Sequence, residues 1–193
     1  MPDGINIIAF SGSSRKGSLN KKVVAAALPY LKQAGAEVTY LDLKEYSLPL
    51  YDGDNEENQG LPEKVQKLKA IFEQADGFFI SSPEYNGYFS GVLKNLIDWL
   101  SRPAEGKPSL ECFLGKTAAV TAASPGGLGG IRALPHIRTL LSNIKVHVIP
   151  EQLSVGNASK AFQEDGTLIS DSQAKALESV CRQLVDVTRA LKK

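Results

Sequence analysis

The chain has 193 residues, which predicts one domain spanning residues 1–193, because domains usually contain about 100–200 residues. Apolar residues make up 42% and charged residues 22% of the sequence, which excludes the intrinsically disordered class. The formal net charge of +1 argues against a protein that coats nucleic acid, because such proteins carry a strong basic excess.

In the first half of the chain, apolar runs bounded by turn residues predict strands, and apolar residues at helical spacing predict helices. We expect a strand over residues 5–10, a helix over 19–34, a strand over 36–43, a helix from 62 to about 75 and a strand over 77–81. Pro29 should kink or break the first helix. The acidic stretch from 51 to 60 predicts an exposed loop.

The second half of the chain continues this alternation. We expect a helix over 91–100, a strand over 116–123, a helix over 130–143, a strand over 146–149 and a helix over about 172–191. Pro135 fits its helix only near the first turn. Five apolar strands alternating with helices predict a three-layer α/β fold, a parallel sheet with helices on both faces. Ligands bind such sheets beyond the carboxyl ends of the strands, so the loops after the first, third and fourth strands are the candidate site.

The loop after the first strand, residues 11–20, gathers hydroxyl, amide and guanidinium groups at a helix start. Ser13, Ser18, Asn20, the backbone N–H groups and the fixed charge of Arg15 favour an anion. Ser18 is equally suited to be the N-cap of the helix. The run from Gly12 to Ser18 resembles a P-loop but lacks its Lys, and no Cys precedes Arg15 as a phosphatase loop requires. The loop therefore predicts a site that holds a phosphate without cleaving it.

The loop after the third strand, residues 81–91, is rich in Tyr, Pro, Asn and Gly. Tyr85 and the backbone around Asn86 are placed to contact a flat ring. Glu84 could order the loop or contact a neighbouring subunit. Phe89 is expected in the core, although Tyr88, Phe89 and the helix around Trp99 are also candidate subunit-interface residues.

The loop after the fourth strand has four glycines in the five positions 126–130. Glycine lets the backbone approach a planar ligand and present N–H donors to it, but a glycine run can also be a flexible lid. The three loops together are a stronger indication of a ligand site than any one of them.

Three motifs in this order resemble those of the NADPH-dependent FMN reductases, a family that includes bacterial quinone, chromate and azo-dye reductases. The motifs are residues 12–20, residues 83–87 with 93–95 and 98–99, and residues 124–127. The resemblance implies a flavodoxin-like fold of strand order 2-1-3-4-5, bound FMN, and assembly as a homodimer or homotetramer. By the family pattern, the FMN phosphate loop comprises Ser13, Arg15, Ser18 and Asn20. The segment along the ring comprises Pro83, Glu84, Tyr85 and Asn86, and the other edge of the ring is met by Ser124 and Gly127.

The resemblance implies an oxidoreductase that takes electrons from NADH or NADPH and passes them by a ping-pong mechanism to a small acceptor. Quinones, chromate, azo compounds and free flavin are the candidate acceptors. Because the flavin supplies the redox chemistry, no side chain is assigned as a general acid or base, and His136 and His147 are expected to be structural or surface residues. The alternative is a flavin-binding electron carrier or redox sensor that acts on a protein partner, which the net charge disfavours. A nucleotide-phosphate hydrolase is weakened by the missing P-loop Lys.

Cys112 and Cys181 are too few for a disulfide framework or a zinc site. No run of about 18 apolar residues and no signal-peptide pattern is present, so we expect a cytoplasmic protein with no membrane or nucleic-acid partner. Residues 4–36 contain no Asp or Glu but five basic residues, which suits one small anionic cofactor.

Overall fold

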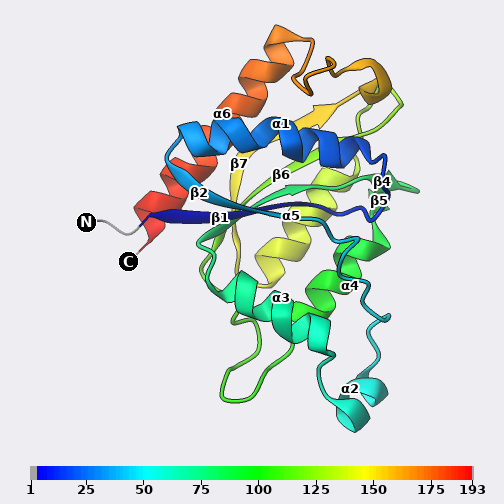
Figure 1. Ribbon diagram of the computed structural model, residues 1–193, viewed down its shortest axis with the longest axis vertical. Coiled ribbons are helices and arrows are strands. Elements are labelled where there is room, and N and C mark those ends of the chain that lie inside the picture. The colour runs from blue at the N-terminus through cyan, green and yellow to red at the C-terminus, as the bar shows by residue number, and fades with distance from the viewer. Residues whose placement is uncertain (1–3, 193) are drawn as a thin grey trace.

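The computed structural model describes residues 4–192 and contains one central parallel sheet (Figure 1). Its strands lie in the order β2-β1-β3-β6-β7, which is the order 2-1-3-4-5 when these five strands alone are numbered. They are β1 (Ile5–Ser11), β2 (Ala36–Leu41), β3 (Gly77–Ser81), β6 (Thr117–Ala123) and β7 (His147–Val155). The expected fold class and strand order are therefore confirmed.

Helices cover both faces of the sheet and give the molecule three layers (Figure 1). One face carries α1 (Leu19–Gln33) and α6 (Asp171–Leu191), and the other carries α3 (Glu63–Glu73), α4 (Gly91–Leu100) and α5 (Ala133–Asn143). Each face buries its own apolar cluster. Because β3 and β6 are buried on both faces, their sequences are continuous apolar or small-residue runs.

The remaining elements are short and lie outside the main sheet. They are α2 (Gly53–Gln59), the hairpin strands β4 (Glu84–Tyr85) and β5 (Tyr88–Phe89), and the 3₁₀ turn η1 (Ala158–Lys160). The stretch 51–60 was expected to be a loop, and α2 corrects this. The Asp52 carboxylate caps α2 by accepting from the N–H groups of Asp54 and Asn55.

Pro29 and Pro135 both lie within helices. Helix α1 runs unbroken through Pro29, so the expected break is absent. Pro29 and Ala25 are both exposed, so the Ala25 carbonyl that loses its helical partner is open to water. Pro135 lies in the first turn of α5, as its sequence position required.

The last strand is longer than expected, because β7 continues past Ile149 to Val155. It passes through Pro150, which is tolerated on an edge strand. A register shift between Ala118 and Val120 of β6 lies beside it. This extension brings the end of β7 level with the end of β6, where Ala123 pairs with Val155.

Cys112 and Cys181 are both free and buried, and burial raises the pKa of both thiols. Within residues 4–192, no helix is both long and apolar enough to cross a bilayer. The same residues contain no cluster of three or more His, Cys, Asp or Glu placed to hold a metal ion.

Candidate functional site

The three candidate loops meet at one edge of the sheet, because β1, β3 and β6 are neighbours and parallel. In Figure 1 the loop before α1 and the β4–β5 hairpin lie together at that edge. Buried polar side chains gather there as well. They are Ser11, Ser13, Ser18, Asn20, Ser81, Ser82 and Ser90. Buried polar groups need partners, so their concentration at a strand-end edge indicates a polar binding site.

The loop from β1 to α1 presents unpaired donors. Within the described chain, the backbone N–H groups of Ser13, Ser14 and residues 16–18 donate to no protein acceptor. Arg15 is exposed, and its backbone N–H donates to Ser13 Oγ at 3.3 Å. Ser18 is the N-cap of α1 and accepts from the Lys21 N–H, so its capping role is observed.

One buried hydroxyl in this loop has no partner. Across residues 4–192, Ser11 Oγ is the buried side-chain polar atom for which no hydrogen-bond partner exists. An orphaned buried hydroxyl is costly unless a ligand or water satisfies it. Together with the unpaired N–H groups and the Arg15 guanidinium, it forms a donor set that fits a phosphate group.

The net positive charge around this loop is smaller than the five basic residues of the segment 4–36 suggest, because one of them is paired with an acid. Lys21 forms an ion pair with Asp42, with Nζ–Oδ distances of 2.5 and 2.7 Å. Partial burial raises the pKa of Asp42, but hydrogen bonds from Lys21 and the Lys44 N–H outweigh it and hold that pKa below its usual value. The positive charge of the loop itself therefore comes from Arg15 and Lys16.

Asn20 lies in the first turn of α1 and is buried. Its Nδ2 donates to the Ala123 carbonyl at 2.9 Å, and its Oδ1 accepts from the Ala123 N–H at 2.9 Å. Oδ1 also accepts from Ser81 Oγ at 2.9 Å. The amide thus contacts the ends of β6 and β3.

The segment after β3 is a tight hairpin rather than an irregular loop. Asn86 and Gly87 have φ angles of 54° and 79°, as an Asn-Gly hairpin turn requires. Tyr85 is 52% exposed and Phe89 is 5% exposed, so the expected core position of Phe89 is confirmed. Pro83 is buried, whereas Asn86 is exposed beside Tyr85. Tyr85 and Asn86 are thus accessible to a ligand at the tip of the hairpin.

An ion pair joins this hairpin to the start of α5. Glu84 Oε1 accepts from Arg132 Nε at 2.7 Å and from Arg132 Nη2 at 2.5 Å. Glu84 Oε2 accepts from the Arg132 backbone N–H at 3.1 Å. Glu84 therefore orders the loop within the chain, which is one of the two roles expected for it. Arg132 had no distinguishing signal in the sequence.

His136 of α5 also packs against the β4–β5 hairpin. The rings of His136 and Tyr88 lie 4.3 Å apart between centroids at an angle of 33°. This agrees with a structural role for His136. His147 lies at the opposite end of the sheet, at the first residue of β7, and is exposed.

The glycine-rich loop 124–130 is fastened along one side to the chain that follows β7. The Ser124 N–H donates to the Val155 carbonyl at 3.2 Å, and the Ala158 N–H donates to the Ser124 carbonyl at 3.0 Å. The Asn157 N–H donates to the Gly126 carbonyl at 3.1 Å. Gly127 is exposed, and a Cβ atom there would meet nothing within 4 Å. The loop is thus anchored rather than a free lid, and it leaves open space at Gly127.

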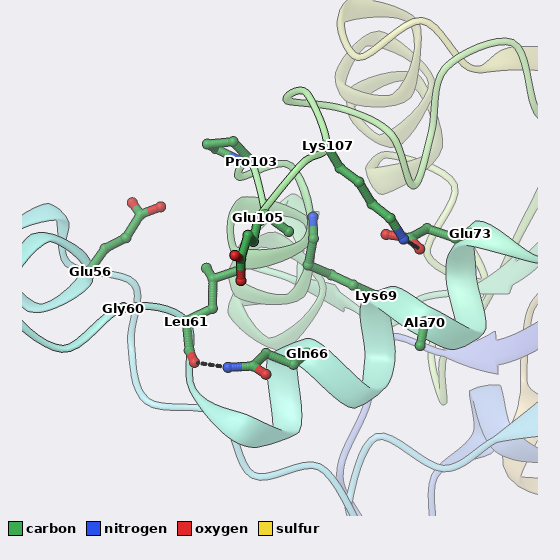
Figure 2. Close-up of a pocket in the computed structure, with 11 residues that line it drawn as sticks. Glu56, Gly60, Leu61, Gln66, Lys69, Ala70, Glu73, Pro103, Glu105 and Lys107 are labelled. Atoms are coloured by element: carbon green, nitrogen blue, oxygen red, sulfur yellow. Dashed lines mark hydrogen bonds and ion pairs between the residues drawn. The ribbon is translucent and has the colours of Figure 1, made fainter.

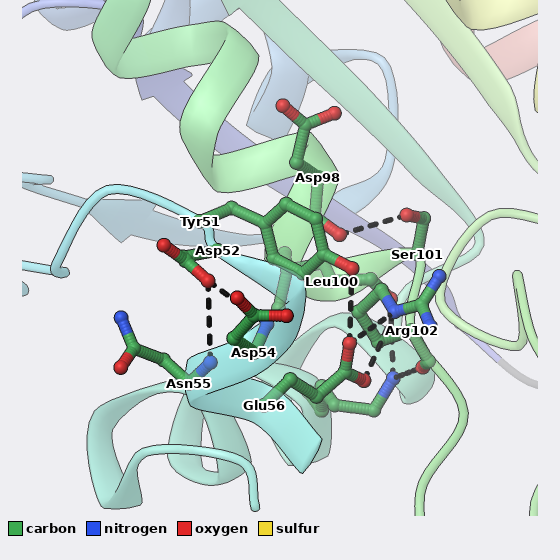
Figure 3. A network of polar contacts seen from close by, with 10 residues as sticks. Tyr51, Asp52, Asp54, Asn55, Glu56, Asp98, Leu100, Ser101 and Arg102 are labelled. Atoms are coloured by element: carbon green, nitrogen blue, oxygen red, sulfur yellow. Dashed lines mark hydrogen bonds and ion pairs between the residues drawn. The ribbon is translucent and has the colours of Figure 1, made fainter. Parts of the chain in front are cut away.

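Helix α4 holds the segment that precedes α2. Asn95 Oδ1 accepts from the Tyr51 N–H at 2.8 Å, while Asn95 Nδ2 and Trp99 Nε1 both donate to the Pro49 carbonyl, at 2.9 and 2.8 Å. Figure 3 shows the continuation, in which Glu56 accepts from the Tyr51 hydroxyl and from Arg102 Nε. The family-like motif residues Asn95 and Trp99 therefore have a structural role, and Trp99 is buried within the chain.

A cavity of about 360 Å³ lies between the β1–α1 loop and α4. It lies between Ser14, the segment 43–48 and the first turns of α4. A second cavity, of about 560 Å³, lies between α3 and residues 103–107 (Figure 2). Its buried Lys69 donates to the Leu100 and Arg102 carbonyls at 3.1 and 2.6 Å, and no residue predicted for the cofactor site lines it. The candidate cofactor site therefore lies at the strand-end loops, away from this second cavity.

The sheet order 2-1-3-4-5 defines a flavodoxin-like α/β fold, with the candidate site at the strand-end loops. The chain belongs to the NADPH-dependent FMN reductase family, whose model matches residues 5–160.

Named relatives agree with this membership. The chain is 36% identical over 185 residues to an NAD(P)H-dependent FMN reductase of Pseudomonas aeruginosa, covering 95% of this chain and 94% of that protein. It is 39% identical over 175 residues to a quinone reductase of Escherichia coli K12, covering 88% and 87%. The structure of FerB, a flavoenzyme NAD(P)H:(acceptor) oxidoreductase of Paracoccus denitrificans, has a TM-score of 0.83 at 28% identity, covering 96% and 98%.

Family membership fixes the class of chemistry. The chain is an oxidoreductase of a family that uses FMN and NAD(P)H. The donor set around Ser11 and Arg15 fits the phosphate of FMN, and the anchored glycine loop and the hairpin stand on the neighbouring strand ends. The sequence did not reveal the supporting contacts of Arg132 and Ser81, because neither residue lies in a recognisable motif.

Proposed function

We propose that the chain is an FMN-dependent NAD(P)H oxidoreductase that reduces small acceptors, quinones foremost, by a ping-pong mechanism. The observation that carries the proposal is the meeting of three loops at one sheet edge: the donor-rich loop with the exposed Arg15, the β4–β5 hairpin and the glycine-rich loop. Relatives of this chain named as quinone oxidoreductases or quinone reductases support the acceptor class.

The chain's own residues bind and orient the cofactor. Arg15, the free N–H groups of the loop and Ser13 would hold the phosphate. Tyr85 and Asn86 would lie along the ring system, and Ser124 and Gly127 would meet its other edge. When bound, FMN supplies the hydride and electron transfer chemistry. The exposure of Tyr85 and Gly127 keeps the site open to a second molecule.

A ping-pong order follows from having one open site. The sequence carries no dinucleotide-binding fingerprint that would give NAD(P)H a separate site, so reductant and acceptor use the same open side in turn. Initial rates measured at several fixed quinone concentrations with NADPH varied should give parallel double-reciprocal lines. Intersecting lines would show that both substrates bind together and would refute the ping-pong order.

An acceptor panel separates the enzyme from the carrier alternative. Quinones, chromate, an azo dye and free flavin are each supplied with NADPH and, separately, with NADH. Turnover with small quinones would support the proposal, and the relative rates with the other acceptors would rank them. Flavin reduction without transfer to any small acceptor would favour the carrier, which the net charge of +1 disfavours.

We also propose that the chain assembles as a homodimer or homotetramer. Phe89 and Trp99 are buried within the chain, so of the residues expected at an interface Tyr88 is available. Leu128 and Ile131, which precede α5, are also exposed, at 60% and 44%, and exposed apolar groups of this kind favour association. Light scattering coupled to size-exclusion chromatography measures the mass, and a monomer would refute the proposal.

A further inference from the structure

The family pattern places Asn20 in the FMN phosphate loop, but its side chain is hydrogen-bonded to the protein, to Ala123 and Ser81. We infer that Asn20 is a positioning residue that fixes the three site loops relative to one another and is not a ligand of the flavin phosphate. The inference rests on the proposed FMN site.

The side-chain amide of Asn20 joins three strand ends. It belongs to the loop and helix that follow β1, and it bonds both backbone polar groups of Ala123, the last residue of β6. It also accepts from Ser81, the last residue of β3. These partners lie 103 and 61 residues away in sequence. One side chain thus links the loops that begin at these three strand ends.

The capacity of the amide is nearly used by these contacts. A side-chain amide has two N–H donors and one oxygen with two lone pairs. Both lone pairs and one donor of Asn20 are bound to protein, and the residue is 2% exposed. Arg15, in the same loop, is exposed and makes no ion pair with any residue between 4 and 192. The two residues are therefore suited to different tasks.

Other contacts in the loop do not replace this link. The Gly12 N–H donates to the Ser81 carbonyl, and Ser90 Oγ donates to the Gly12 carbonyl. Both tie the start of the loop to β3 and α4. In the part of the chain that the structure describes, Asn20 makes the side-chain hydrogen bonds between residues 11–20 and the end of β6. Asn20 is therefore the side-chain link between this loop and the end of β6, where the glycine-rich loop begins, and it adds to the backbone contacts that hold the glycine-rich loop to the chain after β7.

A comparison of FMN with riboflavin, which lacks the phosphate, tests the inference. Asn20→Ala should weaken both flavins by a similar factor of about tenfold or more, because every loop contact is displaced. Arg15→Ala, the matched control, should weaken FMN by about tenfold or more and riboflavin by less than about twofold. Ser81→Ala removes one hydrogen bond and should weaken both flavins alike by about threefold. An FMN-specific loss in Asn20→Ala would make Asn20 a phosphate ligand and overturn the inference.

Amide hydrogen exchange of the flavin-free protein gives a second readout. Asn20→Ala and Ser81→Ala should speed exchange in residues 12–19 and 124–130, whereas Arg15→Ala should leave both segments unchanged. Unchanged exchange in both positioning variants would overturn the inference. If Asn20→Ala does not fold, Ser81→Ala carries the test. If the native protein binds neither flavin, the proposed function fails, and the exchange result still decides the role of Asn20.

Discussion

Gly156 is the position where a single methyl group should disturb the glycine-rich loop. It follows β7, and a Cβ atom built on it would lie 2.2 Å from the Gly127 carbonyl oxygen and 2.9 Å from the Gly127 carbonyl carbon. Ordinary contacts begin near 3.4 Å. Because both atoms belong to the backbone, neither can rotate away, and Gly156→Ala must push the loop outward by about 1 Å.

The expected loss of stability combines two effects. Overpacking costs about 1–3 kcal/mol, and moving the loop weakens the hydrogen bond from the Asn157 N–H to the Gly126 carbonyl, which is worth about 1 kcal/mol. The free energy of unfolding should fall by about 2–4 kcal/mol. For a domain of this size the Tm should then fall by roughly 4–16 °C.

Thermal and urea unfolding of the flavin-free protein measure this loss. Gly126→Ala is the matched control, because a Cβ atom there meets only Ser124 Oγ at 3.8 Å. The control should unfold within about 0.5 kcal/mol of the native protein, apart from its small backbone effect. A Gly156→Ala protein as stable as the control would show that the loop does not lie against Gly156.

Three further substitutions probe charge and aromatic contact in the site. Arg15→Ala should weaken FMN binding roughly 10- to 150-fold, the value of a charged hydrogen bond, and an unchanged affinity in a fluorescence titration would refute the phosphate loop. Tyr85→Ala should alter turnover or acceptor preference in steady-state assays while FMN still binds. Lys21→Met removes the partner that lowers the pKa of Asp42. The Lys21–Asp42 pair stabilises the fold fully above the usual carboxyl pKa of about 4, by about 1 kcal/mol, and loses that contribution as pH falls through the lowered folded pKa. The gap in unfolding free energy between native protein and Lys21→Met should therefore shrink as the pH is lowered from about 6 to 3, and a gap independent of pH would contradict the pairing.

The central sheet was predictable because its strands are local apolar runs, but two segments were not. Strand β7 was expected to stop at Ile149, since Pro150 and the polar residues after it break the apolar pattern. Edge pairing with β6 supports it to Val155, which no local pattern contains. Helix α2 buries none of its residues and is held by the Glu56–Arg102 ion pair, a contact between residues 46 positions apart.

The site was predictable to the level of loops but not of contacts. Loop composition and the family resemblance placed the three segments at one edge, and the Asn-Gly pair at 86–87 was an available signal for the β4–β5 hairpin. The direction in which a side chain points depends on tertiary packing. That is why Asn20, grouped with phosphate-loop residues, is bound to Ala123 and Ser81, and why Arg132 went unnoticed as the partner of Glu84.

Flavin loading followed by anaerobic reduction tests the central claim most directly. The flavin-free protein is titrated with FMN, and the loaded protein is then mixed with NADPH in a stopped-flow spectrophotometer while the flavin absorbance is recorded. One FMN should bind per chain, and its oxidised absorbance should bleach on mixing and return when a quinone is added. A chain that binds no FMN, or whose bound FMN is not bleached by NADPH or NADH, would contradict the assignment of the three loops as a flavin reductase site.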